Sequence, residues 1–305
     1  MGITVHWISI AVRAAKQGYM NAFIADLIAK MRTAGIYTLL VKGQGVAQCY
    51  EKPLWRSFGD VDFLLSDDNY QKAKEYLLPK ATFVEDEEKH KKHLAMTIND
   101  WMVELHGSLR CGFSSRIDKS LDKIYNDTFY GGNVSSWDND GVQVFMLGKE
   151  NNVLYVFVHL LNHFYKGGVG LRQICDWCRL LWTYRDSLNC GILENRIKEM
   201  GLMSEWKAFA ALAVNRLGAP VEAMPLYIDN DNLKKKAERI KDFVLKSGNM
   251  GHNRIAEDAG SKSYLMRMVS SFGQRVGDLV NHARIFPLDS LCFFPSIVLN
   301  GIRQQ

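Results

Sequence analysis

The chain has 305 residues, of which 47% are hydrophobic, and its formal net charge is +5. This length allows two ordinary domains, and the hydrophobic fraction excludes a disordered chain. The mild positive charge, without a long basic run, argues against a duplex-DNA-binding groove and suits a protein that binds an anionic small molecule.

The sequence predicts neither a leader nor a membrane span. Its first twenty residues lack the uninterrupted apolar core and the cleavage site of a signal peptide. The apolar stretch over 286–302 is interrupted by Pro287, Asp289 and Pro295, so it falls short of the roughly 18 apolar residues that a span needs. We therefore expect a cytoplasmic protein whose scattered cysteines are reduced thiols.

Strands and helices alternate in the first half of the chain. The patterns predict, in order, a helix over 19–34, a buried strand in "IYTLLVKG", a strand in "GDVDFLLS", a helix in "NYQKAKEYLLPK", two strands around a charged turn in 82–100, and a strand in "WMVELHGSL". This order is typical of an α/β or α+β module with a small mixed sheet.

The second half is predominantly helical. Residues 126–148 are rich in Gly, Asn and Asp and hold a short strand in "VQVFML". Beyond Gly148, apolar residues recur at helical spacing in several long segments. The sequence therefore predicts a sheet-containing domain over 1–148 and a helical domain over 149–305.

Two aspartates interrupt the apolar strand "GDVDFLLS". Residues two apart in a strand face the same side, so Asp60 and Asp62 project together. In "WMVELHGSL", Glu104 shares one face with Met102 and His106. If the two strands are neighbours, three carboxylates converge, and their mutual repulsion calls for a compensating cation. Such a set of oxygen ligands can hold one or two Mg²⁺ ions.

A glycine turn precedes these acids. In "KGQG", residues 42–45, glycines after a strand let backbone N–H groups approach phosphate oxygens at the start of a helix. Lys42 and Arg56 would add positive charge for a triphosphate. Each feature alone is common in proteins without such a site, and the interpretation depends on their combination.

The combination resembles the uncharacterised nucleotidyltransferase family of the polymerase-β-like superfamily. The residues that carry the resemblance in the first half are Lys42, Gly43, Tyr50, Pro53, Arg56, Asp60 and Asp62, with Glu104 and His106 in "VELHGSL". In the second half they lie in "HLLNHFYKGGVGLRQICDW" and "SGNMGHNR". The resemblance extends from about residue 20 to about residue 255.

The resemblance implies an α+β fold, in which a polymerase-β-like nucleotidyltransferase domain precedes a helical domain that covers the nucleotide. It implies Asp60, Asp62 and Glu104 as catalytic residues and Mg²⁺ ligands. Lys42, Gly43 and Gln44 would then bind the phosphates of the NTP. One departure is that Gln44 follows Gly43, where the superfamily commonly has Gly or Ser.

Four residues of the helical half remain open to two interpretations. His159 and His163 are four apart, at the spacing of a zinc-binding pair, but no glutamate stands where a metalloprotease has its base. Arg172 and Asp176 are also four apart, as in a local ion pair. The alternative for Arg172 is that it binds the nucleotide from the second domain.

Three functions follow. The leading one is a Mg²⁺-dependent enzyme that transfers a nucleoside monophosphate from an NTP to a hydroxyl acceptor, which is a small molecule, a protein side chain or an RNA end. The second is a non-catalytic nucleotide-binding or interaction protein on the same fold. The third, a metallohydrolase that uses His159 and His163, predicts bound zinc.

Overall fold

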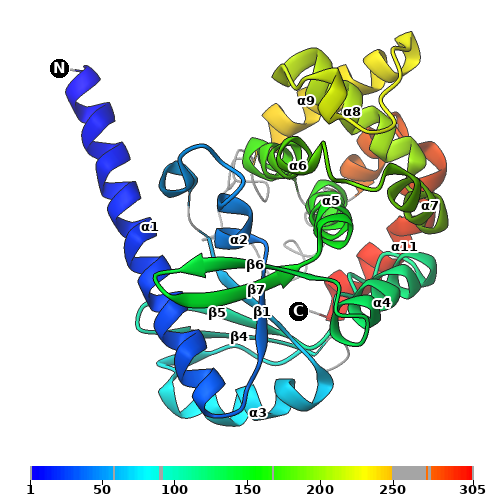
Figure 1. Ribbon diagram of the computed structural model, residues 1–305. Coiled ribbons are helices and arrows are strands. Elements are labelled where there is room, and N and C mark those ends of the chain that lie inside the picture. The colour runs from blue at the N-terminus through cyan, green and yellow to red at the C-terminus, as the bar shows by residue number, and fades with distance from the viewer. Residues whose placement is uncertain are drawn as a thin grey trace, which may run out of the picture. The chain divides into compact units, whose positions relative to one another are not determined.

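The chain folds into two compact units (Figure 1). The computed structural model describes residues 2–57, 59–88, 92–166, 168–248, 273 and 276–303. The first unit consists of Met1–Arg110 and Leu121–Asn152, and the second of Cys111–Ser120 and Val153–Gln305. These units are defined by packing, and the division into two domains after residue 148 stays a prediction.

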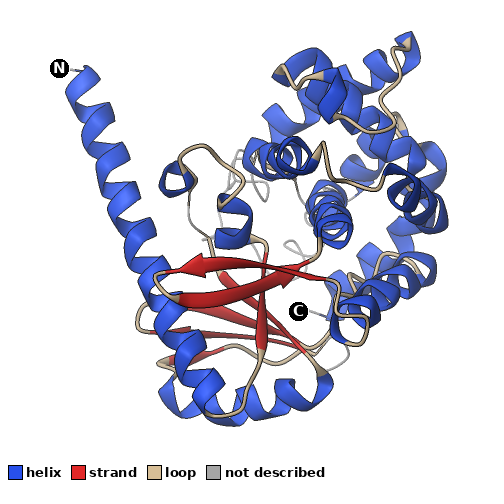
Figure 2. Cartoon of the chain, viewed as in Figure 1, coloured by secondary structure: helices blue, strands red, loops and turns tan. Residues whose placement is uncertain are grey.

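A mixed sheet of seven strands forms the centre of the first unit (Figure 2). Its strands are β1 (Thr38–Val41), β2 (Val61–Leu65), β3 (Phe83–Val84), β4 (His93–Ile98), β5 (Trp101–His106), β6 (Val134–Asn139) and β7 (Val142–Leu147). They lie in the order β3-β4-β5-β2-β1-β7-β6. The β2–β5 and β1–β7 pairs are parallel and the other pairs are antiparallel. The expected α+β class with a mixed sheet is confirmed.

One face of this sheet is apolar and covered by helices. Phe63 of β2 and Leu105 of β5 are fully buried in a core that also holds side chains of α1 (Gly2–Thr33) and α3 (Asp67–Leu77). Figure 1 shows α3 on one side of the sheet and the short helix α2 (Gly43–Ala47) on the other. Since side chains alternate along a strand, the residues between these apolar positions face away from this core.

Two tight hairpins set the register of the antiparallel strands. Asn99 and Asp100 connect β4 to β5 with φ angles of 48° and 66°. Asp140 and Gly141 connect β6 to β7 with φ angles of 54° and 82°. Two consecutive residues with positive φ are typical of a type I′ turn, which favours Asn, Asp and Gly. The first turn fixes which residue of β4 faces each residue of β5.

Several elements of the first half of the chain go beyond the sequence prediction. The helix expected over 19–34 begins much earlier, in α1. The helix α4 (Ser115–Phe129) and the strand β6 were not predicted. Ile117, Leu121 and Ile124 of α4 are buried at helical spacing, and this pattern was the available signal. Short 3₁₀ helices complete this part of the chain, namely η1 (Pro53–Trp55) and η2 (Leu78–Lys80).

The second unit is helical. Its described elements are α5 (Lys149–Lys166), which begins in the first unit, α6 (Leu171–Tyr184), α7 (Cys190–Met200), α8 (Met203–Leu217), η3 (Val221–Ala223), α9 (Asp231–Ser247), a helix over 276–283 and α11 (Pro287–Arg303). Its core contains three fully buried rings, Phe157, Trp177 and Trp206, whose centroids lie 4.8 to 5.1 Å apart. Aromatic contacts of this kind stabilise the packing of α5, α6 and α8.

Across the described part of the chain, no helix combines the length and the apolar character that crossing a bilayer requires. The "SGNMGHNR" stretch, which resembles a family element, lies from Asn249 onward outside the described residues, as does Arg254.

Candidate functional site

The two acidic strands are neighbours in the sheet. β2 pairs in parallel with β5, and Asp62 stands directly beside Glu104 in the register. Both side chains therefore project from the same face, opposite the core residues Phe63 and Leu105. Asp60 is exposed and lies immediately before β2. The structure thus places Asp62 beside Glu104 on one face. Within the described ranges Asp60 is not part of a group of three potential ligands, so its convergence with the other two acids stays a prediction.

Two histidines extend this polar face across a third strand. The Nε2 atom of His106 lies 2.9 Å from Oδ1 of Asp62 and 3.2 Å from Oε2 of Glu104. Because β4 is antiparallel to β5, His93 faces His106, and its Nε2 atom lies 3.2 Å from the same Oε2 of Glu104. Glu104 consequently lies between two imidazole rings.

Lys42 reaches this cluster from the end of β1. Its Nζ atom lies 2.6 Å from Oδ1 of Asp62, and both side chains are largely buried. The backbone of Lys42 has φ 59° and ψ −145°, a region that is almost restricted to glycine and costs about 1–3 kcal/mol for other residues. The surrounding structure holds Lys42 in this strained conformation beside the acid.

The glycine turn packs directly against the first aspartate. Gly43 has φ 40°, and a Cβ atom there would lie 3.2 Å from the backbone oxygen of Asp60. A side chain at this position would therefore be strained and would press on the start of β2. Glycine allows the beginning of α2 and the acidic end of β2 to approach each other.

The charges in this cluster compensate one another. Burial alone would raise the pKa of Glu104, but hydrogen bonds from His106 and His93 outweigh burial and lower this pKa well below its ordinary value. Burial alone would lower the pKa of His106, but hydrogen bonds to Asp62 and Glu104 raise it. The cluster therefore favours an ionised Glu104 beside a protonated His106, with Lys42 as a second positive charge.

Gln44 and Arg56 occupy more enclosed positions. The Gln44 side chain is buried, and its Nε2 atom donates a hydrogen bond of 2.6 Å to Oδ1 of Asn21. The Arg56 guanidinium donates through Nη1 to the carbonyl oxygen of Ser57 at 3.2 Å, and its backbone oxygen accepts a hydrogen bond from Gln17. Their role in phosphate binding stays a prediction.

The other residues that the sequence singled out belong to the helical unit. His159 and His163 lie one turn apart on α5, with their Nε2 atoms 3.0 Å apart. Arg172 and Asp176 lie one turn apart on α6, where Asp176 is buried. A contact between Arg172 and the nucleotide stays a prediction.

One group of potential metal ligands emerges from the described residues. The imidazole and carboxylate ligand atoms of His93, Glu104 and His106 all lie within 4.8 Å of one another. Within the described ranges, the pair His159 and His163 is not part of such a group of three.

The sequence prediction missed His93. The available signal was the turn at Asn99 and Asp100, because a two-residue turn there pairs Ile98 with Trp101 and hence His93 with His106.

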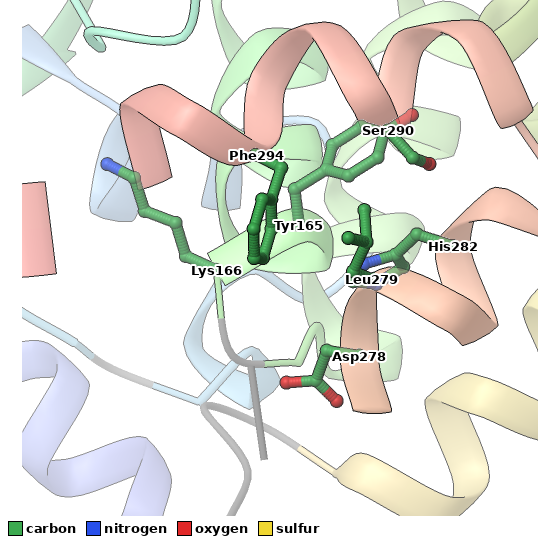
Figure 3. A pocket seen from close by; sticks show the side chains of 7 residues that line it. All are labelled: Tyr165, Lys166, Asp278, Leu279, His282, Ser290 and Phe294. Carbon is green, nitrogen blue, oxygen red and sulfur yellow. The ribbon is translucent and has the colours of Figure 1, made fainter. Parts of the chain in front are cut away.

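A second polar region, of different character, lies inside the helical unit. A cavity of about 10 Å³, roughly the space for one water molecule, is lined by residues that include Tyr165, His282, Ser290 and Phe294 (Figure 3). The hydroxyl of Tyr165 donates a hydrogen bond of 3.0 Å to Oε1 of Glu205, which is fully buried. Burial and the neighbouring Asp289 raise the pKa of Glu205 to about 8.

Comparison with known proteins identifies the family. One solved structure that resembles the chain is the crystal structure of an antigenic nucleotidyltransferase-like protein from Paracoccidioides brasiliensis, at 14% identity and a TM-score of 0.41, covering 70% of this chain and 95% of that one. No curated protein matches the chain. The family described as "Uncharacterised nucleotidyltransferase" matches residues 7–218, most of the chain and all of the acidic strands. The chain therefore belongs to the uncharacterised nucleotidyltransferase family.

Proposed function

We propose that this protein transfers a nucleoside monophosphate from an NTP to a hydroxyl acceptor and releases pyrophosphate. The observation that carries the proposal is the register pair of Asp62 and Glu104 on neighbouring parallel strands, next to the glycine turn. Family membership supports a general role in nucleotidyl transfer. The acceptor is a small molecule, a protein side chain or an RNA end.

The acidic residues suit a divalent cation. Carboxylate oxygens are the ligands that Mg²⁺ prefers, and Asp62 and Glu104 lie side by side on one face. In this proposal Asp60, Asp62 and Glu104 hold one or two Mg²⁺ ions. When bound, Mg²⁺ would neutralise charge on the triphosphate and stabilise the leaving pyrophosphate.

Lys42 would change partners when the NTP binds. Its ammonium now neutralises Asp62 at 2.6 Å. A triphosphate offers it other anionic oxygens, and a cation at Asp62 would take over the neutralisation of the carboxylate. Backbone N–H groups of Gly43 and Gln44, at the start of α2, would add donors to the phosphates. Arg56 completes the proposed set of cationic contacts in the first unit.

Glu104 is the proposed base. An ionised carboxylate can accept the proton of the acceptor hydroxyl. The acceptor oxygen forms a bond to the α-phosphorus while the bond from that phosphorus to the bridging oxygen of the β-phosphate breaks. The leaving pyrophosphate takes the electrons of that bond.

The proposal is tested with NTPs labelled at the α-phosphate, incubated with the purified protein, Mg²⁺ and a cell extract as the source of acceptor. We expect labelled product from the wild type, and a loss of at least about 100-fold in Asp62→Asn. The matched control is Asp100→Asn, an exposed acid in the turn of the same sheet, which should retain activity.

Two results would contradict this function. One is equal product formation by the wild type and by the Asp62→Asn variant. The other is saturable NTP binding without labelled product from any extract, which would favour the alternative of a non-catalytic nucleotide-binding protein.

A further inference from the structure

The polar face of the sheet carries more than the acids that the proposed function needs. His93 on β4 and His106 on β5 face each other in the register, and both approach Oε2 of Glu104 at 3.2 Å. We infer that His93, Glu104 and His106 form a binding site for a divalent transition-metal ion such as Zn²⁺ or Co²⁺. This site shares only Glu104 with the proposed Mg²⁺ site.

The chemistry of the ligands favours this class of ion. Imidazole nitrogens suit Zn²⁺ and similar transition metals, whereas Mg²⁺ demands oxygen ligands in an octahedron. Two imidazoles and one carboxylate are also a recurring ligand set of catalytic zinc sites, which keep a further position open. This composition is therefore mismatched to Mg²⁺ and matched to a transition metal.

The distances agree with a metal centre. With bonds of about 2.0–2.1 Å, ligand atoms of a tetrahedral zinc site lie about 3.3 Å apart. In the structure both histidine nitrogens lie 3.2 Å from Oε2 of Glu104, and all three ligand atoms lie within 4.8 Å of one another. Small side-chain adjustments would suffice to bring the three ligands to a single ion.

The fold holds the three ligands in place and leaves them accessible. All three lie on two strands paired over their full length, and the two-residue turn between these strands fixes the register. Their side chains are between 12% and 25% exposed, so an ion could enter from solvent.

Asp62 connects the two proposed sites. Its Oδ1 atom lies 2.9 Å from Nε2 of His106, so it stands next to the transition-metal ligands and also belongs to the proposed Mg²⁺ set. His93 belongs to the transition-metal set alone, and Asp60 to the Mg²⁺ set alone. These two residues therefore separate the two sites experimentally.

The test uses the full-length protein after chelator treatment, without nucleotide, titrated with Co²⁺ and then with Zn²⁺ in competition. We expect one Co²⁺ per chain with visible d–d absorption, displaced by Zn²⁺. His93→Ala should weaken Zn²⁺ binding at least about tenfold, while Asp60→Ala should leave it unchanged. The matched control is His163→Ala, which removes a histidine of the helical unit and should also leave binding unchanged.

Folding of each variant is checked by circular dichroism, and His93→Gln provides a second variant of more similar shape. X-ray absorption at the zinc edge of the loaded wild type should show two imidazole ligands, a readout that needs no variant. The inference is overturned by the absence of saturable Co²⁺ binding, by equal Zn²⁺ affinity in His93→Ala, by loss of binding in His163→Ala, or by a zinc spectrum without imidazole.

These outcomes are independent of nucleotidyl transfer. A protein that forms labelled product with Mg²⁺ but binds no Co²⁺ would retain the proposed function and lose this inference. A protein that binds Co²⁺ through His93 but forms no product would retain this inference and lose the proposed function.

Discussion

Glu104 in the sheet and Glu205 in the helical unit are both removed from much of the solvent, yet their environments shift the pKa of the carboxyl group in opposite directions. Two imidazole rings approach Glu104, and the pKa of its carboxyl group is lowered. Glu205 is fully buried, has the hydroxyl of Tyr165 as a neutral partner and the acid Asp289 nearby, and its pKa is raised to about 8. Burial penalises the charge in both places, and the neighbouring groups decide the outcome.

This difference separates an acid that can do chemistry from an acid that fills a core. An ionised carboxylate can bind cations or accept a proton, whereas a neutral, enclosed carboxyl group acts as an ordinary polar core residue. The face of β2 and β5 is therefore where activity is expected, and the buried Glu205 beside Tyr165 is where stability is expected to depend on pH.

The largest expected effect is on activity. Glu104→Gln keeps the size of the side chain but removes its charge, so it should lower nucleotidyl transfer by about 1,000-fold, because both the proposed base and a proposed metal ligand are lost. Glu205→Gln should leave the rate unchanged. The measurement is product formation from an NTP labelled at the α-phosphate. Comparable losses in the two variants would break the distinction between the two acids.

The second effect is on stability and follows from the raised pKa of Glu205. Its folded-state pKa of about 8 exceeds the ordinary value of 4.5, so folding favours the protonated form. The folded state therefore loses stability as the pH rises from about 4.5 to about 8, by about 3 kcal/mol between about pH 5 and about pH 7.5. Glu205→Gln should remove this loss.

Urea unfolding at about pH 5 and about pH 7.5 measures the free energy of unfolding of Glu205→Gln and of the wild type. Relative to the wild type, the variant should be more stable at the higher pH than at the lower pH. Glu222→Gln, an exposed acid on η3, should show no such change. A difference between Glu205→Gln and the wild type that is the same at both pH values would mean that Glu205 is not neutral in the folded protein.

The sequence revealed the faces of single strands better than the contacts between them. Alternation placed Glu104 with His106 on one face of β5, because that periodicity is a local property. The parallel register that sets Asp62 beside Glu104 joins segments distant in the chain and is determined by packing. The ion pair of Lys42 depends on a backbone conformation that sequence patterns do not predict for lysine.

Other features were within reach of the sequence. The turn at Asn99 and Asp100 sets the pairing of His93 with His106. Glu205 stands three, four and seven residues before Ala208, Phe209 and Leu212, so it lies on the apolar stripe of α8, and helical periodicity alone indicates its burial. Its neighbours on α5 and α11 come from distant segments and could not be inferred in the same way.

A smaller effect concerns the turn that positions the sheet acids. Gly43→Ala should destabilise the protein by about 2 kcal/mol, since the new Cβ atom adds a close contact with Asp60 to the strain of a positive φ. Gly132→Ala is the matched control, because it has φ 69° with nothing within 4 Å of the added carbon, and about 1 kcal/mol is expected. Urea unfolding of both variants gives the comparison. Equal losses would show that the approach of the glycine turn to β2 adds no constraint.

The smallest effect concerns the partner of the neutral acid. Tyr165→Phe removes the hydroxyl that donates to Oε1 of Glu205, and leaving that oxygen without its donor should cost about 1 kcal/mol near pH 6. This hydrogen bond favours the ionised carboxylate, so its removal raises the pKa of Glu205 further, and the loss should grow above about pH 8, where the wild-type side chain ionises. Urea unfolding near pH 6 and above about pH 8 measures the loss of stability in Tyr165→Phe. The exposed Tyr130→Phe is the control, and its free energy of unfolding should match that of the wild type at each pH. A loss that stays constant with pH would mean that the hydroxyl stabilises the packing of α5 and α8 without sensing the charge on Glu205.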